Sequence, residues 1–466
     1  MKLQFLGANR QVTGSRYFLQ ASGLGILIEC GMFQEREFRE RNWKDCPVNP
    51  DRIDVLLLTH VHLDHCGLIP KFVREGYQRK ILTTYATSDL LPILLLDSAR
   101  IQEEDAAYKK KRHKKEKRKG PYPEIPLYTV DDAEKALPLV QGVAYDEPIS
   151  LNNRVTVRFR DAGHILGSSM LELDVTEGEE SRKIIFSGDI GQKDKPIVKD
   201  PTQFTQADYV VMETTYGSRI HGDTEDVETL LIKIINETIE AGGNIVIPTF
   251  AIERAQEIMF HLSRLVRKDK IPYLMIFLDS PMAVDATAVF QRHRECLDDE
   301  TVELIVKNQR PFRFPGLKLV HSVEQSKAIN QIKGSCIIMA GSGMCTGGRI
   351  KHHLIQNIGR EESTILFVGY QAQGTLGRKI VSGFSPVRIH GQHYDVRARI
   401  EQIHGFSAHA DRNGLQEWLK SFKNSPRKIF LTHGEEDEAE SFARLMNEEW
   451  GWDAVVPGYQ EEWTLD

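Results

Sequence analysis

Three histidines and one aspartate lie close together in the segment THVHLDHCG, which spans residues 59–67 and directly follows the apolar run VLLL. His60 and His62 are two residues apart at the end of an expected strand, so both side chains can point to one side. Asp64 and His65 follow where the chain turns into a helix, so they can face elsewhere. Neutral imidazole and carboxylate groups are good ligands for zinc and other divalent cations. The segment therefore predicts two metal half-sites rather than one.

Each half-site needs further ligands, and three more polar side chains directly follow apolar strands. They are His164 in RDAGHILGSS, Asp189 in FSGDIG and His433 in FLTHGE. Each residue alone has an ordinary alternative, as a turn histidine or a turn-capping aspartate. Because all three share the position at a strand end, we expect them to complete the half-sites.

The composition is that of an ordinary globular chain without a global positive field. Its 466 residues carry 60 basic and 66 acidic side chains, which gives a net charge of −6. The six cysteines form no CxxC pair, as is typical of reduced thiols in a cytosol. The N-terminus has no apolar signal-peptide core, and no run of about 18 apolar residues is present to span a membrane. We therefore expect a soluble cytoplasmic protein without a membrane partner, and a homodimer is one oligomeric state that the sequence leaves open.

The pattern of expected elements changes twice along the chain. Residues 1–208 consist mainly of short strands, whereas residues 209–394 alternate apolar strands with helices. Such alternation is typical of a parallel sheet with crossover helices. Short strands return in residues 395–466, among them RARIEQI at 397–403. We therefore expect a first domain formed by the two outer segments and interrupted by an inserted α/β domain.

Ordered motifs along the chain resemble a known family. HVHLDH, AGHILGS, SGDIG and LTHGE resemble the metallo-β-lactamase superfamily. METTYG before the inserted segment and HGFSAHAD after it resemble the β-CASP branch of nucleic-acid-processing hydrolases. LGANRQVTGS, PTFAIERAQE, LDSPMA, GSGMCTGGR and GYQAQGTLGR extend the resemblance over essentially the whole chain. It implies an αββα sandwich of residues 1–208 and 395–466 with a β-CASP α/β cap domain of residues 209–394.

The resemblance also implies a role for each site residue, with two zinc ions per chain. By motif, one zinc falls to His60, His62 and His164, the other to Asp64, His65 and His433, and Asp189 bridges the two. Catalysis falls to Asp64 with the motif A acid Glu213 and the motif B histidine His409. In this pattern His409 is the general acid toward the leaving 3′-oxygen and Glu213 fixes its tautomer. A purely structural turn histidine is the alternative for His409.

Two further positions bear on substrate and metal affinity. His433 is the motif C residue, and RNA-processing members resemble this chain in having histidine there, whereas DNA-repair members typically carry an apolar residue. The chain departs from the family at Glu29 in LIECG, where aspartate is usual. Because glutamate is one methylene longer, we expect a shifted ligand histidine or a small backbone adjustment, and a changed metal affinity.

The Gly-rich segment GSGMCTGGR at 341–349 lies between an expected strand and an expected helix. Backbone N–H groups at such a junction suit phosphate, although Gly-rich turns more often only reverse the chain. Its position in the inserted domain, together with GTLGR downstream, favours phosphate binding. The residues that we expect to contact RNA are Ser342, Gly343, Met344, Arg349 and Arg378.

Residues 109–119 form the most basic segment, in which nine of eleven residues are Lys or Arg. One interpretation is an RNA-binding arm that acts through counterion release. The other is a solvated, mobile loop of the first domain. We favour the loop, with weak binding of the RNA backbone as a secondary use. His113 within the segment is not expected to be a metal ligand.

The function that the resemblance implies is a zinc-dependent ribonuclease that cuts single-stranded RNA by a two-metal mechanism, with endonucleolytic cleavage favoured. The chain looks like the endonuclease subunit of pre-mRNA 3′-end processing in a compact, prokaryotic-type form. A 5′ exoribonuclease is one alternative, and a non-catalytic RNA-binding scaffold is another, although such scaffolds lose metal ligands and all seven positions are filled here. A hydrolase of small esters or lactams is a third alternative, which the inserted domain and the Glu213–His409 pair disfavour.

Overall fold

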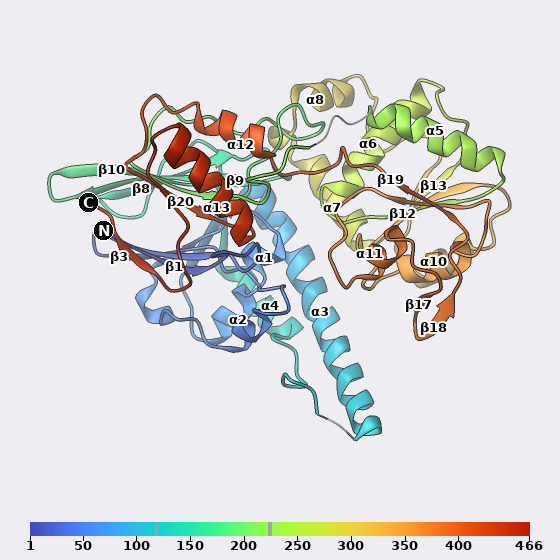
Figure 1. Ribbon diagram of the computed structural model, residues 1–466, viewed down its shortest axis with the longest axis horizontal. Coiled ribbons are helices and arrows are strands. Elements are labelled where there is room, and N and C mark those ends of the chain that lie inside the picture. The colour runs from blue at the N-terminus through green and yellow to red at the C-terminus, as the bar shows by residue number, and fades with distance from the viewer. Residues whose placement is uncertain (118, 222–225) are drawn as a thin grey trace. The chain divides into compact units, whose positions relative to one another are not determined.

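The computed structural model describes residues 1–117, 119–221 and 226–466 and divides them into two compact units (Figure 1). The first unit comprises Met1–Asp194, Lys199–Ile220 and His409–Asp466, and the second comprises Lys195–Val198 and His221–Ala408. Both changeovers lie later in the chain than the expected domain boundaries at 208/209 and 394/395. No helix in the described parts of the chain has both the length and the apolar character to cross a membrane.

Two seven-stranded sheets form the first unit, with strand orders β22-β1-β2-β3-β4-β5-β6 and β21-β20-β11-β10-β9-β8-β7. The strands of the first sheet are β1 (Lys2–Gly7), β2 (Arg16–Ala21), β3 (Leu24–Ile28), β4 (Val55–Leu57), β5 (Lys80–Thr84), β6 (Val140–Val143) and β22 (Glu462–Thr464). Those of the second are β7 (Ile149–Ser150), β8 (Val155–Asp161), β9 (Ser169–Glu177), β10 (Glu180–Phe186), β11 (Tyr209–Glu213), β20 (Lys428–Thr432) and β21 (Ala454–Val455).

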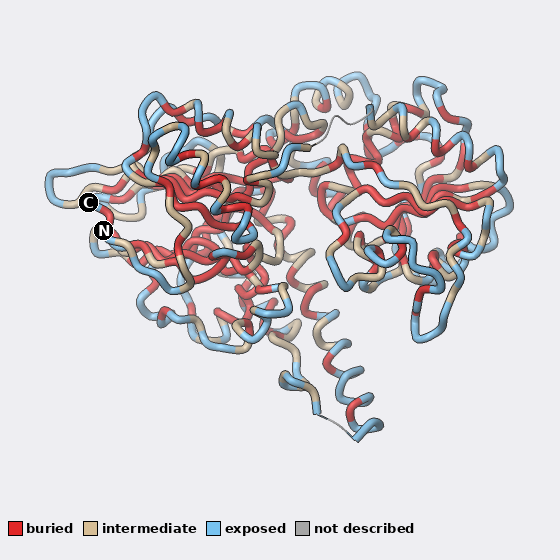
Figure 2. Tube along the Cα trace, in the orientation of Figure 1, coloured by how far each residue is buried: buried red, intermediate tan, exposed pale blue. Residues whose placement is uncertain are grey.

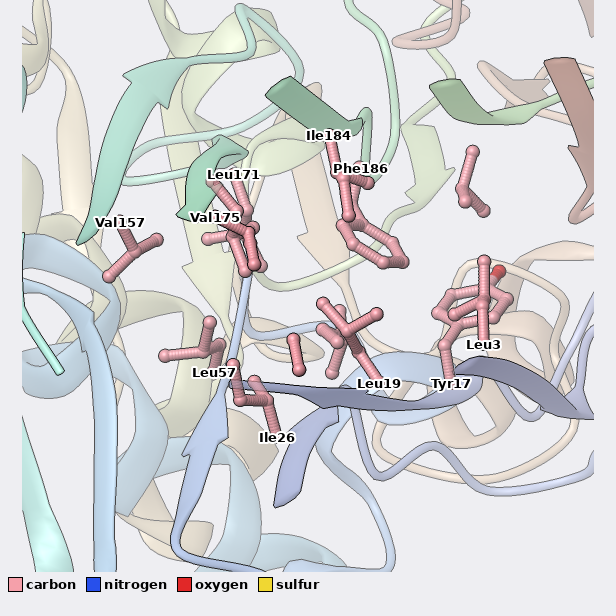
Figure 3. Packing of buried hydrophobic residues seen from close by; sticks show 14 of the residues in the cluster. Leu3, Tyr17, Leu19, Ile26, Leu57, Val157, Leu171, Val175, Ile184 and Phe186 are labelled. Atoms are coloured by element: carbon pink, nitrogen blue, oxygen red, sulfur yellow. The ribbon is translucent and has the colours of Figure 1, made fainter. Parts of the chain in front are cut away.

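The two sheets pack face to face over one apolar core. Alternate residues of β8 are buried, as expected for a strand with one face on a core. Figure 3 shows Leu19 and Leu57 of the first sheet pointing toward Leu171 and Phe186 of the second. A shift of one residue in strand register would turn the apolar side chains of that strand to the opposite face of the sheet. The core therefore fixes the register of the strands that carry the site.

Helices cover the outer faces of both sheets, which makes the four-layer αββα arrangement (Figure 1). Over the first sheet lie α1 (Leu63–Cys66), α2 (Ile69–Arg74), α3 (Tyr85–Glu116) and α4 (Val130–Ala136). Over the second lie α12 (Arg412–Leu419) and α13 (Glu436–Arg444), which a π-helical turn at Leu445–Glu449 continues. Their apolar side chains, among them Trp418 and Phe442, pack on Val210 and Leu431 of the second sheet.

The basic segment at 109–119 is helical up to Glu116, so the expectation of a loop is wrong. Residues 109–116 form the last two turns of α3, and lysine and arginine are good helix formers. His113 is buried, and its Nδ1 lies 2.6 Å from Glu124 Oε1. The returning segment therefore covers one side of the helix end, and the lysines remain exposed on the other sides. Of the basic residues in this segment, Arg118 lies outside the described residues.

A parallel six-stranded sheet, ordered β14-β13-β15-β12-β16-β19, forms the centre of the second unit. Its strands are β12 (Ile245–Pro248), β13 (Met275–Asp279), β14 (Leu317–Leu319), β15 (Cys336–Ala340), β16 (Thr364–Phe367) and β19 (Arg399–Gln402), and β17 (Val387–Ile389) and β18 (Gln392–Tyr394) form a separate hairpin. The helices are α5 (Val227–Glu240), α6 (Arg254–Arg267), α7 (Pro281–Arg292), α8 (Asp299–Val306), α9 (Val323–Ile329), α10 (Ile350–Asn357) and α11 (Leu376–Val381). The sheet is buried between helices, α5 and α6 on one face and α10 and α11 on the other (Figures 1 and 2).

Strand β19 corrects the expected membership of RARIEQI. It pairs in parallel with β16, so it belongs to the second unit rather than to the C-terminal part of the first. Conversely, β11 pairs with β10 and β20 in the first unit. Short strands of similar composition carry no local mark of the sheet that they join, because pairing is decided by distant partners.

The strand order of the second unit reverses direction between β12 and β15. From β12 the chain crosses to β13 on one side, whereas from β15 it crosses to β16 on the other. In open parallel sheets, ligands bind at the carboxyl ends of the strands at such a switch point. The segments that leave β12 and β15 there are Thr249–Phe250 and the Gly-rich loop 341–349.

Candidate active site

All seven predicted metal ligands belong to the first unit and lie where strands end. His60 and His62 follow β4, and Asp64 and His65 lie in α1, whose N-cap residue is His62. The remaining ligands follow β8, β10 and β20 in the second sheet and are His164, Asp189 and His433. Because these three strands run in the same direction, their carboxyl ends meet at one edge of the sandwich.

The first half-site gathers three imidazoles and one carboxylate oxygen. His60 Nε2 lies 3.1 Å and His164 Nε2 3.3 Å from His62 Nδ1. Asp189 Oδ2 lies 3.3 Å from His60 Nε2 and 3.4 Å from His164 Nε2. The four ligand atoms are all within 4.8 Å of one another, which is the set that the sequence predicts for one zinc.

The second half-site lies on the other oxygen of the same aspartate. His65 Nε2 is 3.1 Å from His433 Nε2, and His433 Nε2 is 3.4 Å from Asp64 Oδ2. Asp189 Oδ1 lies 3.2 Å from His65 Nε2 and 3.6 Å from His433 Nε2. Asp189 thus presents one oxygen to each predicted ligand set.

The ionisation of the ligands differs between the two half-sites. Burial lowers the pKa of His60 to about 3 and that of His164 well below its ordinary value, so both imidazoles are neutral and offer lone pairs. Burial alone would raise the pKa of Asp64 and Asp189, but the facing histidines hold both below the usual carboxyl range. Among the described residues no hydrogen bond reaches the buried Asp189 Oδ1. In the first half-site, neutral imidazoles converge on a buried carboxylate oxygen, which forms a good cation site. In the second, burial lowers the pKa of His65 and His433, but the facing carboxylates more than offset this and raise both, so a cation bound there would release protons.

Two threonine hydroxyl groups that the sequence motifs did not single out orient the imidazoles of His60 and His433. Thr59 Oγ1 lies 3.0 Å from His60 Nδ1, and Thr215 Oγ1 lies 3.1 Å from His433 Nδ1. The local signal is weak: Thr59 directly precedes the motif histidine His60, and Thr215 follows the motif A acid Glu213 by two residues. Such contacts fix the ring nitrogen that faces the metal.

Glu29, the departure from the family pattern, lies beneath the second half-site. Its Oε1 accepts a hydrogen bond from the Thr59 N–H at 3.2 Å and lies 3.6 Å from His65 Nδ1. Burial raises the pKa of Glu29, although the nearby imidazole of His65 opposes this. The longer side chain therefore lies beside the ligand histidine at ion-pair distance, without a hydrogen bond to it.

Glu213 and His409 form a bonded pair beside the first half-site. His409 Nδ1 lies 3.0 Å and 3.1 Å from the two carboxylate oxygens of Glu213. The Ile190 N–H donates to Glu213 Oε1 at 2.6 Å, and His409 forms an isolated β-bridge with Gly191. Both residues are therefore anchored to the segment that follows β10. His409 Nε2 lies 3.9 Å from Asp189 Oδ2 and therefore faces the ligand cluster.

The charge of Glu213 changes the acidity of His409. Burial lowers the pKa of His409, but the carboxylates of Glu213 and Asp189 more than offset this and raise it to about 9. The imidazole is therefore protonated at neutral pH and presents an N–H at Nε2. Such a group can deliver a proton to a developing oxyanion.

The residues predicted to bind RNA all belong to the second unit and differ in how freely they can do so. The Ser342 hydroxyl accepts hydrogen bonds from the Thr346 and Gly347 N–H groups and so shapes its own loop. Among the described residues no acceptor meets the N–H groups of Gly343 and Met344. Gly343 is buried and Met344 is half-buried, so Met344 is the more accessible of the two to an anion.

The two predicted RNA-binding arginines have different surroundings. Arg349 Nη1 donates to Asp279 Oδ1 at 2.7 Å, and its Nη2 donates to the His321 carbonyl at 2.6 Å, so the guanidinium mainly fastens the loop. Arg378, in the first turn of α11, is exposed, and no described carboxylate pairs with it. Arg378 is therefore the more available of the two for phosphate.

Comparison with known protein families assigns three segments of the chain to domain families. The model of the metallo-beta-lactamase superfamily matches residues 10–236, that of the Beta-Casp domain matches residues 255–380, and that of the Zn-dependent metallo-hydrolase RNA specificity domain matches residues 393–457. The predicted fold class, a sandwich with an inserted α/β domain, and the predicted family resemblance are confirmed.

Similar proteins include relatives that the chain matches over nearly its whole length. Ribonuclease TTHA0252 of Thermus thermophilus is 36% identical over 96% of this chain and 96% of that protein. From Methanocaldococcus jannaschii, an RNase J-like protein is 30% identical over 95% of both chains, and transcription termination factor FttA is 31% identical over 95% of this chain and 68% of its own. A crystal structure of a protein of unknown function from Enterococcus faecalis covers 100% of this chain and 99% of its own at a TM-score of 0.56 and 12% identity, which shows the fold alone.

Proposed function

Because this chain belongs to the β-CASP family of the metallo-β-lactamase superfamily, we propose that it is a zinc-dependent ribonuclease that cuts single-stranded RNA internally. The observation that carries the proposal is the position of Asp189 between the two ligand sets: its Oδ2 faces one set and its Oδ1 faces the other. A relative named a ribonuclease and another named RNase J-like support RNA as the substrate.

Two cations fit these ligand sets, and the donor chemistry favours zinc. We assign one cation to His60, His62 and His164 and the other to Asp64, His65 and His433, with Asp189 shared. Bound there, a cation pair supplies Lewis-acid polarisation of the phosphodiester and a nucleophilic water at neutral pH. The protein's own part is to hold the ligands rigidly at strand ends, where the core of the sandwich restrains the backbone.

Proton delivery to the leaving group falls to His409. When the P–O bond breaks, the 3′-oxygen gains negative charge and must accept a proton. The imidazolium can donate the Nε2 proton, because Glu213 holds the opposite nitrogen in its protonated form. Asp64 contributes as a ligand rather than as a proton donor, because its pKa is held low by His433.

Binding of the RNA backbone falls to the loops at the carboxyl edge of the second unit's sheet. The phosphate contacts that we propose are the exposed Arg378 and the N–H groups of Gly343 and Met344, which meet no acceptor among the described residues; Met344 is the less buried of these two. Ser342 and Arg349 support the shape of this loop, and Arg349 does so through Asp279.

The test follows cleavage of a single-stranded RNA labelled at either end. We expect internal fragments that disappear after chelation, return with zinc and weaken in His409→Ala. Release of mononucleotides from the 5′ end would show that the protein is an exonuclease with the same chemistry, rather than an endonuclease. Two bound zinc ions without any cleavage would favour the non-catalytic scaffold instead.

A further inference from the structure

Two aromatic side chains of the second unit are exposed at the carboxyl edge of its sheet. Phe250 follows β12 by two residues and is 41% exposed, and Tyr370 follows β16 by three residues and is 60% exposed. Because β12 and β16 are neighbouring parallel strands, the two residues leave the sheet at the same edge. Isolated exposed aromatics are common, so the surroundings must decide whether this pair has a use.

The Phe250 ring lies against Gly343 and close to Gly369. A methyl group on Gly343 would lie 2.8 Å from ring atoms Cδ2 and Cε2, and one on Gly369 would lie 3.8 Å from Cε2. The absence of a side chain at Gly343 is therefore what lets the ring approach the Gly-rich loop. One side of the ring is supported by backbone while much of the rest remains open to solvent.

A buried glutamine fastens the loops beneath these aromatics. Gln371 Nε2 donates to the carbonyl oxygens of Gly343 at 3.0 Å and Gly369 at 3.2 Å, and the side chain is almost completely buried. The Gly377 N–H donates to the Met344 carbonyl, which connects the start of α11 to the same loop. The aromatics thus project from cross-linked loops, which reduces the ordering cost of binding.

The chemistry of this edge is that of a nucleotide site. Among the described residues no acceptor meets the N–H of the half-buried Met344, which suits a phosphate, and the Phe250 ring lies against the neighbouring Gly343. Aromatic rings beside a phosphate-binding surface are how proteins bind single strands without sequence preference, because every base has a π-face.

We propose that Phe250 and Tyr370 form a stacking shelf for the bases of the RNA whose backbone contacts the adjacent Gly-rich loop. The inference rests on the proposed function and adds how a strand of any sequence is held. Loss of one stacked base is expected to weaken RNA binding by roughly 5- to 100-fold.

Binding by the chelator-treated full-length chain tests the shelf without cleavage. Two fluorescently labelled probes are compared by anisotropy: oligoadenylate and an abasic oligomer with the same number of phosphates. We expect Phe250→Ala and Tyr370→Ala to weaken binding of oligoadenylate but not of the abasic oligomer. Phe250→Trp should retain the binding, because the larger ring can still stack. Tyr273→Ala, which removes an aromatic that is 74% exposed just before β13 at the opposite edge of the sheet, should change neither.

The outcomes separate this inference from the proposed function. Equal weakening of both probes by the alanine variants would overturn the shelf and assign these residues to loop support. Unchanged binding of both probes would overturn it as well, while RNA cleavage by the unsubstituted chain would leave the ribonuclease standing. If the unsubstituted chain neither bound nor cut RNA, the proposed function and the shelf would fall together.

Discussion

At the scale of single residues, the Glu213 carboxylate decides how long the His409 imidazole keeps its proton. Glu213→Gln removes the charge that raises the pKa of His409 to about 9 and retains the shape of the side chain. We expect kcat to fall and its descending limb to move to lower pH, because the general acid loses its proton sooner. Profiles of kcat against pH for both proteins measure the shift.

The histidine itself provides the stronger test. His409→Ala should lower kcat by at least about 100-fold, which is the lower range for loss of a general acid. His393→Ala, which removes an exposed histidine of β18, is the matched control and should leave kcat unchanged. Superimposable pH profiles for the Glu213 variant and the wild type would contradict the assigned role.

A second prediction at the scale of single residues concerns Glu29 and the affinity for zinc. Glu29→Gln keeps an oxygen that can accept from the Thr59 N–H and removes the charge that faces His65 Nδ1. We expect zinc affinity to fall by roughly 10- to 100-fold, as for other groups that orient a metal ligand. Competition with a chromophoric chelator measures it, with the exposed Glu37→Gln as control. An unchanged affinity would show that Glu29 only fills space.

At the scale of elements, the C-terminal end of α3 carries positively charged side chains that form no ion pairs with described residues. Lys110, Lys111, Lys114 and Lys115 are exposed, and no described carboxylate pairs with them. Changing all four to glutamine should reduce the slope of log affinity for long RNA against log salt by up to about 3, at roughly 0.7 per lost phosphate contact. The same four positions changed to arginine retain the charge and should retain the slope.

RNA length is the second variable in that experiment. The helix begins at Tyr85, next to the loop that carries His164, because Thr84 and Thr87 both donate to the Gly167 carbonyl. At about 1.5 Å per residue, Lys110 lies roughly 37 Å along α3. A six-nucleotide RNA should therefore bind equally to both proteins. If the glutamine variant weakened binding of this short RNA just as much, a contact at the basic helix end would not be the cause.

A second element-scale prediction concerns the buried carboxylate at the end of β13. Asp279 accepts from Arg349 and from His353 Nε2 at 2.7 Å and 2.6 Å and also from Ser326. Asp279→Asn should destabilise the second unit by about 3 kcal/mol, because it leaves a cation without its partner. Urea unfolding followed by far-UV circular dichroism measures the change, and the exposed Asp285→Asn is the control.

The pH dependence of that difference has a definite sign. Burial alone would raise the pKa of Asp279, but the hydrogen bonds from His353, Ser326 and Arg349 hold it below the usual carboxyl value. The stabilisation is therefore fully present above the ordinary carboxyl pKa and is lost as the pH falls through the depressed one. A gap between wild type and Asp279→Asn that grew on acidification would contradict this.

At the scale of the whole molecule, metal and stability should be coupled in the first unit alone, because all seven ligands belong to it. Chelation should lower the melting midpoint of this unit by an amount on the order of 10 °C, since a cation at about a thousand times its Kd contributes about 4 kcal/mol. The five tryptophans, which all belong to the first unit, report its melting by fluorescence. They are Trp43, Trp418, Trp450, Trp452 and Trp463.

Circular dichroism, which follows both units, provides the comparison. We expect its signal to retain a transition that chelation does not move, because the second unit holds none of the seven ligands. Restoring zinc should return the fluorescence midpoint to its original value. Equal shifts by both methods would show that the two units unfold together.

The sequence by itself determined the fold class and pointed to the ligands. Histidines and aspartates at strand ends can be recognised in the sequence, because burying a polar side chain next to a buried strand costs free energy unless it has a partner. The motifs also placed Glu213 and His409 together across 196 residues, and the structure brings them within hydrogen-bonding distance.

Only the tertiary structure decided what distant pairing controls. It assigned β19 to the second unit's sheet, extended α3 into the basic segment as far as Glu116, and fastened Arg349 to Asp279. It also turned the two oxygens of Asp189 toward different ligand sets and set Phe250 against Gly343. Local sequence cannot encode these features, because each depends on which side chains from other strands occupy the space beside a residue.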